Sequence, residues 1–434
     1  MTISLPTAVS TAKGSLIRAA TIVQQDGPHA LVQRMARLAY QRSRAWELDE
    51  PVPDADIADS ATLRLAEPSV RPTPGRPLTI GWVTTPPGAG SGGHTTLLRM
   101  VEAAEQAGHR CVLFLTDRFD GDLVEHARVI REWWPSVRAT VRDARHGITG
   151  VDAAVASSWD TAHVLASRGT QPMRRLYFVQ DFEPWFSARG AIHALAEDTY
   201  RFGFRTIALG EAVAGALRGE IGIDPDVTSF GCDTSVYRPL PDAVRTGVVA
   251  YARPGVPRRG FELTRLGLAR FHSLRPDVPI HMYGEVVRGL PFPAVQHGRL
   301  TPQQLNELYN MCVAGVAPSF TNVSLVVEEM LAAGTVPVVN DSPYARADLP
   351  NPSVAWTRPT PEGFAQALIT VLDGPDRETT AADAARSVRQ HGWTRAQADV
   401  VRIIEDEVYG PLDGRLPQPA PAPVPVSARA VVTG

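Results

Sequence analysis

Short apolar segments alternate with longer amphipathic ones along most of this chain, and this alternation constrains its fold more than any other feature. Strand-like segments lie at 78–85, 111–117, 151–158, 174–181 and 205–210, with helix-like segments such as 95–108 between them. Strands separated by helices are typical of parallel sheets that carry helices on both faces. The first half of the chain is therefore predicted to form a doubly wound α/β domain.

A second series of the same kind begins at residue 246. Its expected strands are 246–253, 279–284, 314–319 and 336–340, and its expected helices are 260–274, 301–312 and 323–333. The two series meet near 238–246. The sequence therefore predicts an α/β protein with two doubly wound, Rossmann-like domains that face a cleft. We place their bounds at 78–240 and 241–392, followed by a crossover helix at 393–412.

The two ends of the chain differ from this pattern. Residues 1–50 are predicted to be a helical extension, because Leu31, Met35, Leu38 and Ala39 repeat at helical spacing with arginines between them. Such a basic amphipathic helix suits packing on the main body, or contact with a membrane surface. Residues 51–77 have the composition of a Pro-rich linker or strap, and residues 413–434 that of a disordered Pro/Ala-rich tail.

Composition excludes several classes of protein. Forty-three basic and 46 acidic residues give a net charge of −3, so no overall positive field favours nucleic acid. The cysteines Cys111, Cys232 and Cys312 have no CxxC spacing, which argues against a disulfide scaffold and a zinc site. No apolar run approaches the ~20 residues of a membrane span, and the N-terminus lacks a signal-peptide core. We expect a cytoplasmic protein, with peripheral contact at the inner membrane face through the N-terminal helix as an option.

Polar residues follow two expected strands of the first domain. The glycine-rich segment 88–94 contains Gly92, Gly93 and His94 and leads into a helix, where backbone N–H groups are available to a ligand. It matches neither GxGxxG nor a P-loop. His94 is either a ligand-facing group or a structural cap. In the second segment, 177–186, Asp181 and Glu183 lie among aromatic residues, a combination that suits a sugar, although a turn with solvated acids has the same composition.

The second domain contains an arginine cluster and a pair of adjacent glutamates. Arg253, Arg258 and Arg259 lie between a strand and a helix, where guanidinium groups can hold a diphosphate. Farther on, Ser319, Thr321 and Asn322 are each able to cap the following helix. Within that helix we expect Glu328 to lie on a solvated face. Glu329, about two turns beyond Thr321, is expected on the ligand side.

These segments together resemble nucleotide-sugar glycosyltransferases of the GT-B fold. The similarity is greatest to glycosyltransferase family 4, and within it to rhamnosyltransferases that use dTDP-rhamnose. It covers roughly residues 78–400 and rests on motifs in the family's order: SGGH (91–94), YFVQDFEP (177–184), FGCDTSVYRP (230–239), YARPxxPRR (251–259), HGRLTPQQLNELY (297–309) and TNVSLVVEEMLAAG (321–334).

The resemblance implies a nucleotide-sugar donor bound chiefly by the second domain. The base would lie near Tyr283, Gly284 and the loop with His297, Gly298 and Leu300, and Glu329 would bond the ribose. The diphosphate would be held by Arg253 and Arg259 and by the start of the helix at Thr321, Asn322, Val323 and Ser324, with Arg258 a further candidate of the same cluster. The acceptor would approach Gly92, Gly93, His94 and the 180–183 loop. The candidate catalytic residues in these two segments are Asp181, Glu183 and His94.

One position departs from the wider family, which has a glutamate where this chain has Thr321. The resemblance implies that this glutamate holds the donor sugar, so the exchange leaves the sugar and the stereochemistry open. No DxD motif is present at a strand end with a partner, so we expect no metal and no cofactor besides the donor substrate.

Three functions remain compatible with the sequence. The first is a hexosyltransferase, with rhamnose from dTDP-rhamnose as the expected sugar and a glycan or lipid-linked saccharide of the cell envelope as the acceptor. The second is a non-catalytic nucleotide-sugar or glycan-binding subunit. The third is a sugar epimerase of the same fold, because one fold can carry different functions.

Overall fold

The computed structural model describes residues 52–88, 90–119, 121–323 and 325–410, together with Val32, Met35 and Ala39, which are helical. The chain divides into two units, Met1–Ala55 and Asp56–Gly434, and both sheets belong to the second unit. Most of the predicted N-terminal extension and the predicted tail from residue 413 lie outside the described residues, as does Ser324. No helix in the described part of the chain is long and apolar enough to cross a membrane.

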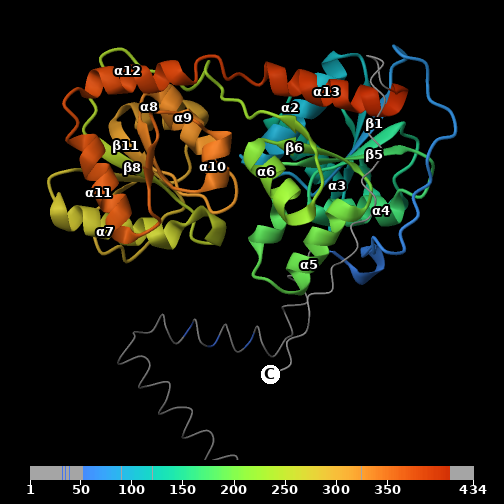
Figure 1. The fold of residues 1–434 in the computed structure, drawn as a ribbon, viewed down its shortest axis with the longest axis horizontal. Helices are drawn as coiled ribbons and strands as arrows, with labels where there is room; N and C mark the ends of the chain where they lie inside the picture. The colour runs from blue at the N-terminus through green and yellow to red at the C-terminus, as the bar shows by residue number, and fades with distance from the viewer. Residues whose placement is uncertain are drawn as a thin grey trace, which may run out of the picture. The chain divides into compact units, whose positions relative to one another are not determined.

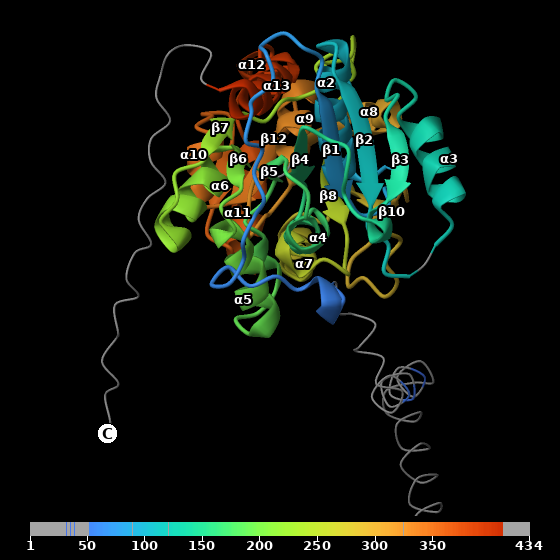
Figure 2. The same ribbon diagram turned by 90° about the vertical axis from the view of Figure 1, so that its right-hand side faces the viewer.

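The first sheet contains, within the described residues, seven parallel strands in the order β3-β2-β1-β4-β5-β6-β7. Figure 2 shows the strands in this order from one edge of the sheet to the other. The five inner strands are strongly buried and apolar, which explains why a sheet covered on both faces forms here. The strands are β1 (Thr79–Thr84), β2 (Arg110–Leu115), β3 (Thr140–Asp143), β4 (Ala153–Ala156), β5 (Arg174–Val179), β6 (Arg205–Leu209) and β7 (Asp226–Thr228).

Helices cover both faces of this sheet. One apolar layer joins the strands to α2 (Gly92–Gln106), α3 (Leu123–Trp133) and α13 (Thr394–Tyr409), and a second layer joins them to α4 (Trp159–Arg168) and α6 (Glu211–Ala216). The shorter α5 (Ala191–Asp198) lies beside α4. Single turns of 3-10 or π-helix complete the domain: η2 (Asp54–Asp56), η3 (Ala144–His146), η4 (Glu183–Phe186), η5 (Thr199–Arg201) and η6 (Leu217–Ile221).

The second sheet has six strands among the described residues, again all parallel, in the order β10-β9-β8-β11-β12-β13. One layer of its core includes α8, α9 and α12, and the other includes α7 and α11. The strands are β8 (Gly247–Ala252), β9 (Ile280–Gly284), β10 (Val295–Gln296), β11 (Cys312–Val316), β12 (Val336–Asn340) and β13 (Ala355–Thr357). The helices are η7 (Pro257–Arg259), α7 (Phe261–Leu274), α8 (Pro302–Asn310), α9 (Leu325–Ala333), α10 (Pro343–Asp348), α11 (Pro361–Leu372) and α12 (Arg377–Ser387).

The chain returns from the second sheet to the first through α13. Figure 1 shows this helix, in red, over the first sheet, where it packs against α2 and β7. The two connections between the sheets touch each other, because the Cys232 N–H donates to the His391 carbonyl at 2.6 Å. A Cβ atom at Gly231 would lie 2.8 Å from the Trp393 backbone, so only glycine fits at this crossing.

The predicted fold class, two Rossmann-like α/β domains, is confirmed by these sheets. The expected strand 336–340 coincides with β12, and most other expected elements overlap the observed ones closely. The proposed helix 95–108 begins earlier, at Gly92, so the glycines belong to its first turn. Strands β3, β7, β10 and β13 were not predicted, because these short edge strands lack the buried apolar run of the inner strands. The domain bounds drawn from the sequence stay predictions.

The position of α13 predicts that the C-terminal helix stabilises the first domain. Ile404 is fully buried in the layer between α13 and the first sheet. We expect Ile404→Ala to lower the unfolding free energy of that domain by about 2–5 kcal/mol, because it leaves a cavity. Urea unfolding measures the loss. The control Val244→Ala removes a 77% exposed side chain and should stay within about 0.5 kcal/mol. Equal effects of the two substitutions would contradict the packing described.

Candidate functional site

A small, shallow pocket opens at the carboxyl ends of β8 and β11. These two strands are neighbours in the second sheet although β9 and β10 come between them in the sequence. The connections that leave β8 and β11 therefore run toward opposite edges of the sheet. This topological switch point leaves a crevice between them, and doubly wound sheets bind ligands in such a crevice. The pocket is lined by Tyr251, Arg259, Val316, Ala317, Pro318 and Val326.

Arg259 is the cationic group of this pocket. It ends the single turn η7, and its Nη1 donates to the Ser319 hydroxyl at 3.0 Å. Asn340, at the end of β12, holds Ser319 in place: its Oδ1 accepts from the Ser319 N–H at 2.7 Å, and its Nδ2 donates to the Ser319 carbonyl at 2.8 Å. The segments that follow β8, β11 and β12, which are neighbours in the sheet, thus determine where the Arg259 guanidinium lies.

The loop after β5 in the first domain meets the loop before α9 in the second. The Thr321 hydroxyl donates to Asp181 Oδ2 at 2.9 Å, and Asn322 Nδ2 donates to the Gln180 carbonyl at 2.8 Å. The sequence predicted that Thr321 and Asn322 cap the helix that follows. In the structure these donors reach the other domain instead, so the two lobes are joined at this point.

Arg258 lies between the same two loops. Its guanidinium carbon is 3.9 Å from the centre of the Phe186 ring, and its Nε is 3.9 Å from Asp181 Oδ2. Cation–π contacts of this kind hold an arginine while leaving part of its hydrogen-bonding capacity unused. Burial raises the pKa of Asp181, and the charges of Arg259 and Arg258 oppose that shift. Burial likewise lowers the pKa of both arginines, which Asp181 counteracts.

Three buried polar atoms at this junction have no hydrogen-bond partner among the described residues: Asp181 Oδ1, Arg258 Nε and Asn322 Oδ1. Asp181 itself is only 6% exposed. Buried polar groups are almost always paired in folded proteins, since an unpaired one costs about 1–3 kcal/mol. These three atoms lie together where the loop after β5 meets the loop before α9.

Glu183 lies two residues beyond Asp181 but its carboxylate is used inside the first domain. Its Oε2 accepts a hydrogen bond from the Trp159 N–H at the start of α4, and another from the Tyr177 hydroxyl at 3.0 Å. Burial raises the pKa of Glu183 to about 8, and the nearby Asp160 carboxylate contributes to the shift. The sequence predicted a catalytic carboxylate. The geometry instead favours a residue that anchors the 180–186 loop.

The glycine-rich segment lies beside that loop. A Cβ atom added at Gly93 would lie 3.8 Å from Gln180 Oε1, whereas one at Gly92 would meet open space. The His94 ring bridges two hydroxyls on its N-terminal side, with Nδ1 2.9 Å from the Ser91 hydroxyl and Nε2 3.3 Å from the Thr85 hydroxyl. Burial lowers the pKa of His94, so this imidazole is held in its neutral form.

The two adjacent glutamates of α9 have different surroundings. Glu329 is half-buried, and burial raises its pKa to about 7, while hydrogen bonds from Tyr237 and Tyr309 lower it in part. Glu328 was expected on a solvated face, and that expectation is wrong. Glu328 is 7% exposed, and its Oε1 lies 3.4 Å from Nδ1 of His391 in the returning connection.

The residues predicted to surround the base lie at the ends of β9 and β10. Tyr283 is buried, and its hydroxyl lies 2.8 Å from that of Tyr309. The Gly284 N–H donates to the Gly298 carbonyl at 2.8 Å. Gly284 has a φ of 104°, and a Cβ atom there would lie 2.5 Å from the Ala252 carbonyl oxygen, so glycine is required.

The other predicted site residues are distributed as follows. His297 Nε2 is 3.0 Å from Nδ1 of His281, and Leu300 packs partly against the core. Arg253 is exposed, with its Nη1 3.5 Å from the Tyr251 hydroxyl. Val323 is buried beside the interdomain contact, whereas Ser324 lies outside the described residues. The structure therefore brings Asp181, Arg258, Arg259, Thr321 and Asn322 together most closely.

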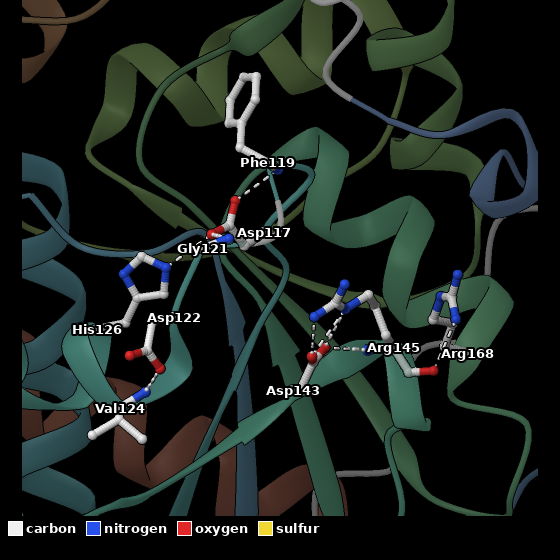
Figure 3. Close-up of polar contacts among 9 residues, drawn as sticks. All are labelled: Asp117, Phe119, Gly121, Asp122, Val124, His126, Asp143, Arg145 and Arg168. Carbon is white, nitrogen blue, oxygen red and sulfur yellow. Dashed lines mark hydrogen bonds and ion pairs between the residues drawn. The ribbon is translucent and has the colours of Figure 1, made fainter.

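Two groups of residues escaped the sequence analysis. Asp348, on α10, accepts from the Ala212 N–H at 2.7 Å, so it joins the second domain to the start of α6, and burial raises its pKa to about 7. No motif marked it. The second group closes the loop after β2 (Figure 3): Asp117 accepts from the Phe119 and Gly121 N–H groups and lies 2.8 Å from His126 Nε2. Its signal was the run of polar residues and glycine after a buried strand.

No cluster of three or more His, Cys, Asp or Glu side chains suited to a metal ion occurs in the described ranges. This observation does not test whether the reaction needs a metal. Independence of metal ions stays a prediction from the sequence.

The raised pKa of Glu183 predicts how stability changes with pH. The folded state holds this proton more tightly than the unfolded state, so stability falls as pH rises from about 5 to 8, by up to about 1.4 kcal/mol per unit. We expect Glu183→Gln, which cannot ionise, to show a flatter dependence in urea titrations at pH 5, 6, 7 and 8. The control Glu362→Gln removes an exposed glutamate whose pKa is lowered by Arg270, so it should keep the wild-type slope. Equal slopes for wild type and Glu183→Gln would be the contrary result.

Comparisons with known proteins place this architecture among GT-B structures. No family model matches the chain. Over 275 residues, 58% of the chain, it is 34% identical to the O-antigen biosynthesis protein RfbC of Myxococcus xanthus, but it spans only 20% of that protein's length. A glycosyltransferase from Rickettsia africae matches with a TM-score of 0.53 and 12% identity, over 77% of this chain and 99% of that one. Anabaena Alr3699/HepE, in complex with UDP-glucose, matches with a TM-score of 0.56 and 15% identity, over 76% and 98% of the two chains. These likenesses show that the fold is GT-B.

Proposed function

We propose that this protein is a glycosyltransferase of polysaccharide or O-antigen biosynthesis that uses a nucleotide-sugar donor. The observation that carries the proposal is the position of Arg259: it lines the pocket at the switch point of the second sheet and is fixed there by Ser319. The Arg259 guanidinium, held at this switch point, suits the negative charge of a diphosphate. The sugar attached to that diphosphate would then extend toward the first domain. The name of the Myxococcus relative and the UDP-glucose of the Anabaena structure agree with this assignment.

The donor is assigned to the second domain. Arg259 and Arg253 would hold the diphosphate together with backbone N–H groups before α9, and Glu329 would bond the ribose hydroxyls. The base would lie against Tyr283, Gly284 and the loop of His297, Gly298 and Leu300. In support, the Glu329 carboxyl is half-buried among tyrosines, and Gly284 and Gly298 are hydrogen-bonded to each other at the ends of β9 and β10.

Fixed positive charge supplies the catalysis in this proposal. When the bond from the sugar to the diphosphate breaks, negative charge grows on the leaving group and positive charge on the sugar ring. Guanidinium and backbone N–H groups that are already oriented stabilise the leaving group without reorganising, and the low polarity of a buried site strengthens them. No step in this scheme requires a metal ion.

The acceptor hydroxyl would enter from the first domain. Asp181 and His94 are the groups proposed to take its proton, because both lie at carboxyl ends of the first sheet and His94 is held neutral. Glu183 is a weaker candidate, since its carboxylate is bonded to Trp159 and Tyr177. Rhamnose from dTDP-rhamnose is the proposed sugar, and a glycan or lipid-linked saccharide the proposed acceptor, on the motif resemblance.

A thermal-shift panel of dTDP-, UDP- and GDP-sugars tests the donor class. A ligand present at 100 times its dissociation constant adds about 2.7 kcal/mol of stability, which is readily seen as a higher melting temperature. We expect a nucleotide sugar to give such a shift and, with an acceptor saccharide, to release its nucleoside diphosphate. Binding without transfer to any acceptor would favour the binding subunit. Conversion of the sugar without an acceptor would favour the epimerase.

The role of Arg259 gives a kinetic prediction. We expect Arg259→Ala to lower kcat by about 10²–10³-fold, because one preoriented contact to the leaving group is lost. Sugar transfer measured at saturating donor detects the change. The matched control Arg270→Ala removes a half-exposed arginine of α7 that pairs with Glu362, and its rate should equal that of the wild type. A wild-type rate for Arg259→Ala would refute the assignment.

A further inference from the structure

Helix α10 of the second domain makes contacts with both domains. It follows β12, and Figure 1 shows it facing α6 of the first domain, against which it packs. Ala345, and Leu349 just after the helix, are buried in the core of the second domain. Tyr344 and Asp348, which lie one helical turn apart on another face of α10, reach the first domain instead.

Asp348 caps a helix that is not part of its own domain. Gly210, which precedes α6, has no side chain that could cap it. Asp348 Oδ1 takes that place and accepts a hydrogen bond from the Ala212 N–H at 2.7 Å. A side chain at Gly210 would collide with Asp348 Oδ1, and its φ of 93° also favours glycine. The beginning of α6 therefore depends on a carboxylate of the second domain.

Tyr344 adds an aromatic contact to the same interface. Its ring centre lies 5.2 Å from that of Trp185, and the ring packs against the core of the first domain. The surface of α6 that faces Tyr344 contains glycine. A Cβ atom at Gly215 would already lie 3.4 Å from the Tyr344 ring, so a side chain larger than that of alanine would push α10 away. The surfaces of α6 and α10 are thus complementary.

The Asp348 carboxylate is only partly satisfied in this position. Its Oδ2 is buried and has no hydrogen-bond partner among the residues that the structure describes. Burial raises the pKa of Asp348 to about 7, although nearby N–H groups, that of Ala212 first, oppose the rise. A buried carboxylate oxygen without a partner is costly. The contact therefore fixes how α10 meets α6 but is suited to release.

These contacts lie beside the proposed donor pocket. Helix α10 follows shortly after Asn340, which holds Ser319 and through it Arg259. The Val323 N–H, in the loop before α9, is among the groups that lower the pKa of Asp348. With α10 packed on α6, the pocket at β8 and β11 is shallow. Sites that enclose a small ligand have volumes of about 300–1,000 Å³, so a nucleotide sugar needs a deeper cleft than this arrangement offers.

We propose that Tyr344 and Asp348 of α10 form a latch between the two domains, which must release before a nucleotide enters the pocket of Arg259. This inference rests on the proposed function and adds a step that controls access to the donor site. Release leaves α6 without its cap and exposes the Tyr344 ring, so both contacts oppose it. A site that is open for only a fraction of the time has its apparent affinity lowered by that fraction. Weakening the latch should therefore strengthen nucleotide binding.

Tyr344→Ala tests the latch without altering a charge. We expect UDP or dTDP to bind this variant about 3- to 30-fold more tightly and to associate faster, because the open arrangement is more populated. Isothermal titration and stopped-flow mixing measure both changes. Asp348→Ala should act in the same direction, and Asp348→Asn, which keeps one acceptor oxygen, to a smaller degree. The control Arg346→Ala removes an exposed guanidinium of α10 that pairs with Asp341, and it should leave the affinity unchanged.

Hydrogen exchange in α6 shows whether the latch has opened. The amides at the beginning of α6, that of Ala212 above all, should exchange roughly tenfold faster in Tyr344→Ala and Asp348→Ala than in wild type or Arg346→Ala. A merely structural role for α10 would speed this exchange and weaken nucleotide binding together. Melting curves verify that each variant is folded. If Tyr344→Ala does not fold, the milder Tyr344→Leu is judged by the same criteria.

The outcomes separate the latch from the proposed function. Faster exchange in α6 together with tighter binding of UDP or dTDP supports the latch. Equal or weaker nucleotide binding by the Tyr344 variant, or unchanged exchange, overturns it while the donor proposal stands. If neither the wild type nor any variant binds a nucleoside diphosphate, the proposed function falls, and the latch as a control on donor entry falls with it.

Discussion

The candidate site depends on one contact between the two domains. In it, Asp181 of the first domain meets Thr321, Arg258 and Arg259 of the second. Removing a carboxylate and two guanidiniums from water is costly, and mutual attraction offsets that cost only where the geometry is well fixed. The position of Arg259 is fixed by hydrogen bonds: Asn340 makes two with the Ser319 backbone, and the Ser319 hydroxyl accepts one from Arg259. Charges that stay buried and incompletely paired are commoner at functional sites than in ordinary cores.

The first domain supports its half of the contact from within. The loop that carries Asp181 continues into η4, where Glu183 is anchored by Trp159 and Tyr177, and Phe186 packs under Arg258. One short segment thus supplies a buried carboxylate at the interdomain contact, an internal anchor and an aromatic support for Arg258. Asp348 adds a second interdomain contact through the start of α6. Because both contacts involve carboxylates of raised pKa, the association of the domains is expected to depend on pH.

The alternation of apolar and amphipathic segments was sufficient to predict the inner strands of both sheets, because a strand buried on two faces has few alternatives to a parallel sheet. It also placed the candidate site residues Asp181 and Arg259 after strand ends, where the structure shows them. Which way each side chain points could not be predicted. Glu183 turns inward because the N–H groups that start α4 attract a carboxylate, and Glu328 is buried because the returning chain brings His391 against it. Both depend on contacts between distant parts of the sequence.

The GT-B fold alone does not determine chemistry, since proteins of different activity share it. The central claim is therefore about occupancy: one end of the donor lies on Arg259 and the other reaches the loop of Asp181. A crystal structure with a bound, unreacted nucleotide sugar examines this claim most directly. The account predicts the diphosphate within hydrogen-bond distance of Arg259, with the sugar directed toward the loop that carries Asp181. A diphosphate bound elsewhere, with Asp181 and Arg258 still unpartnered, would contradict it.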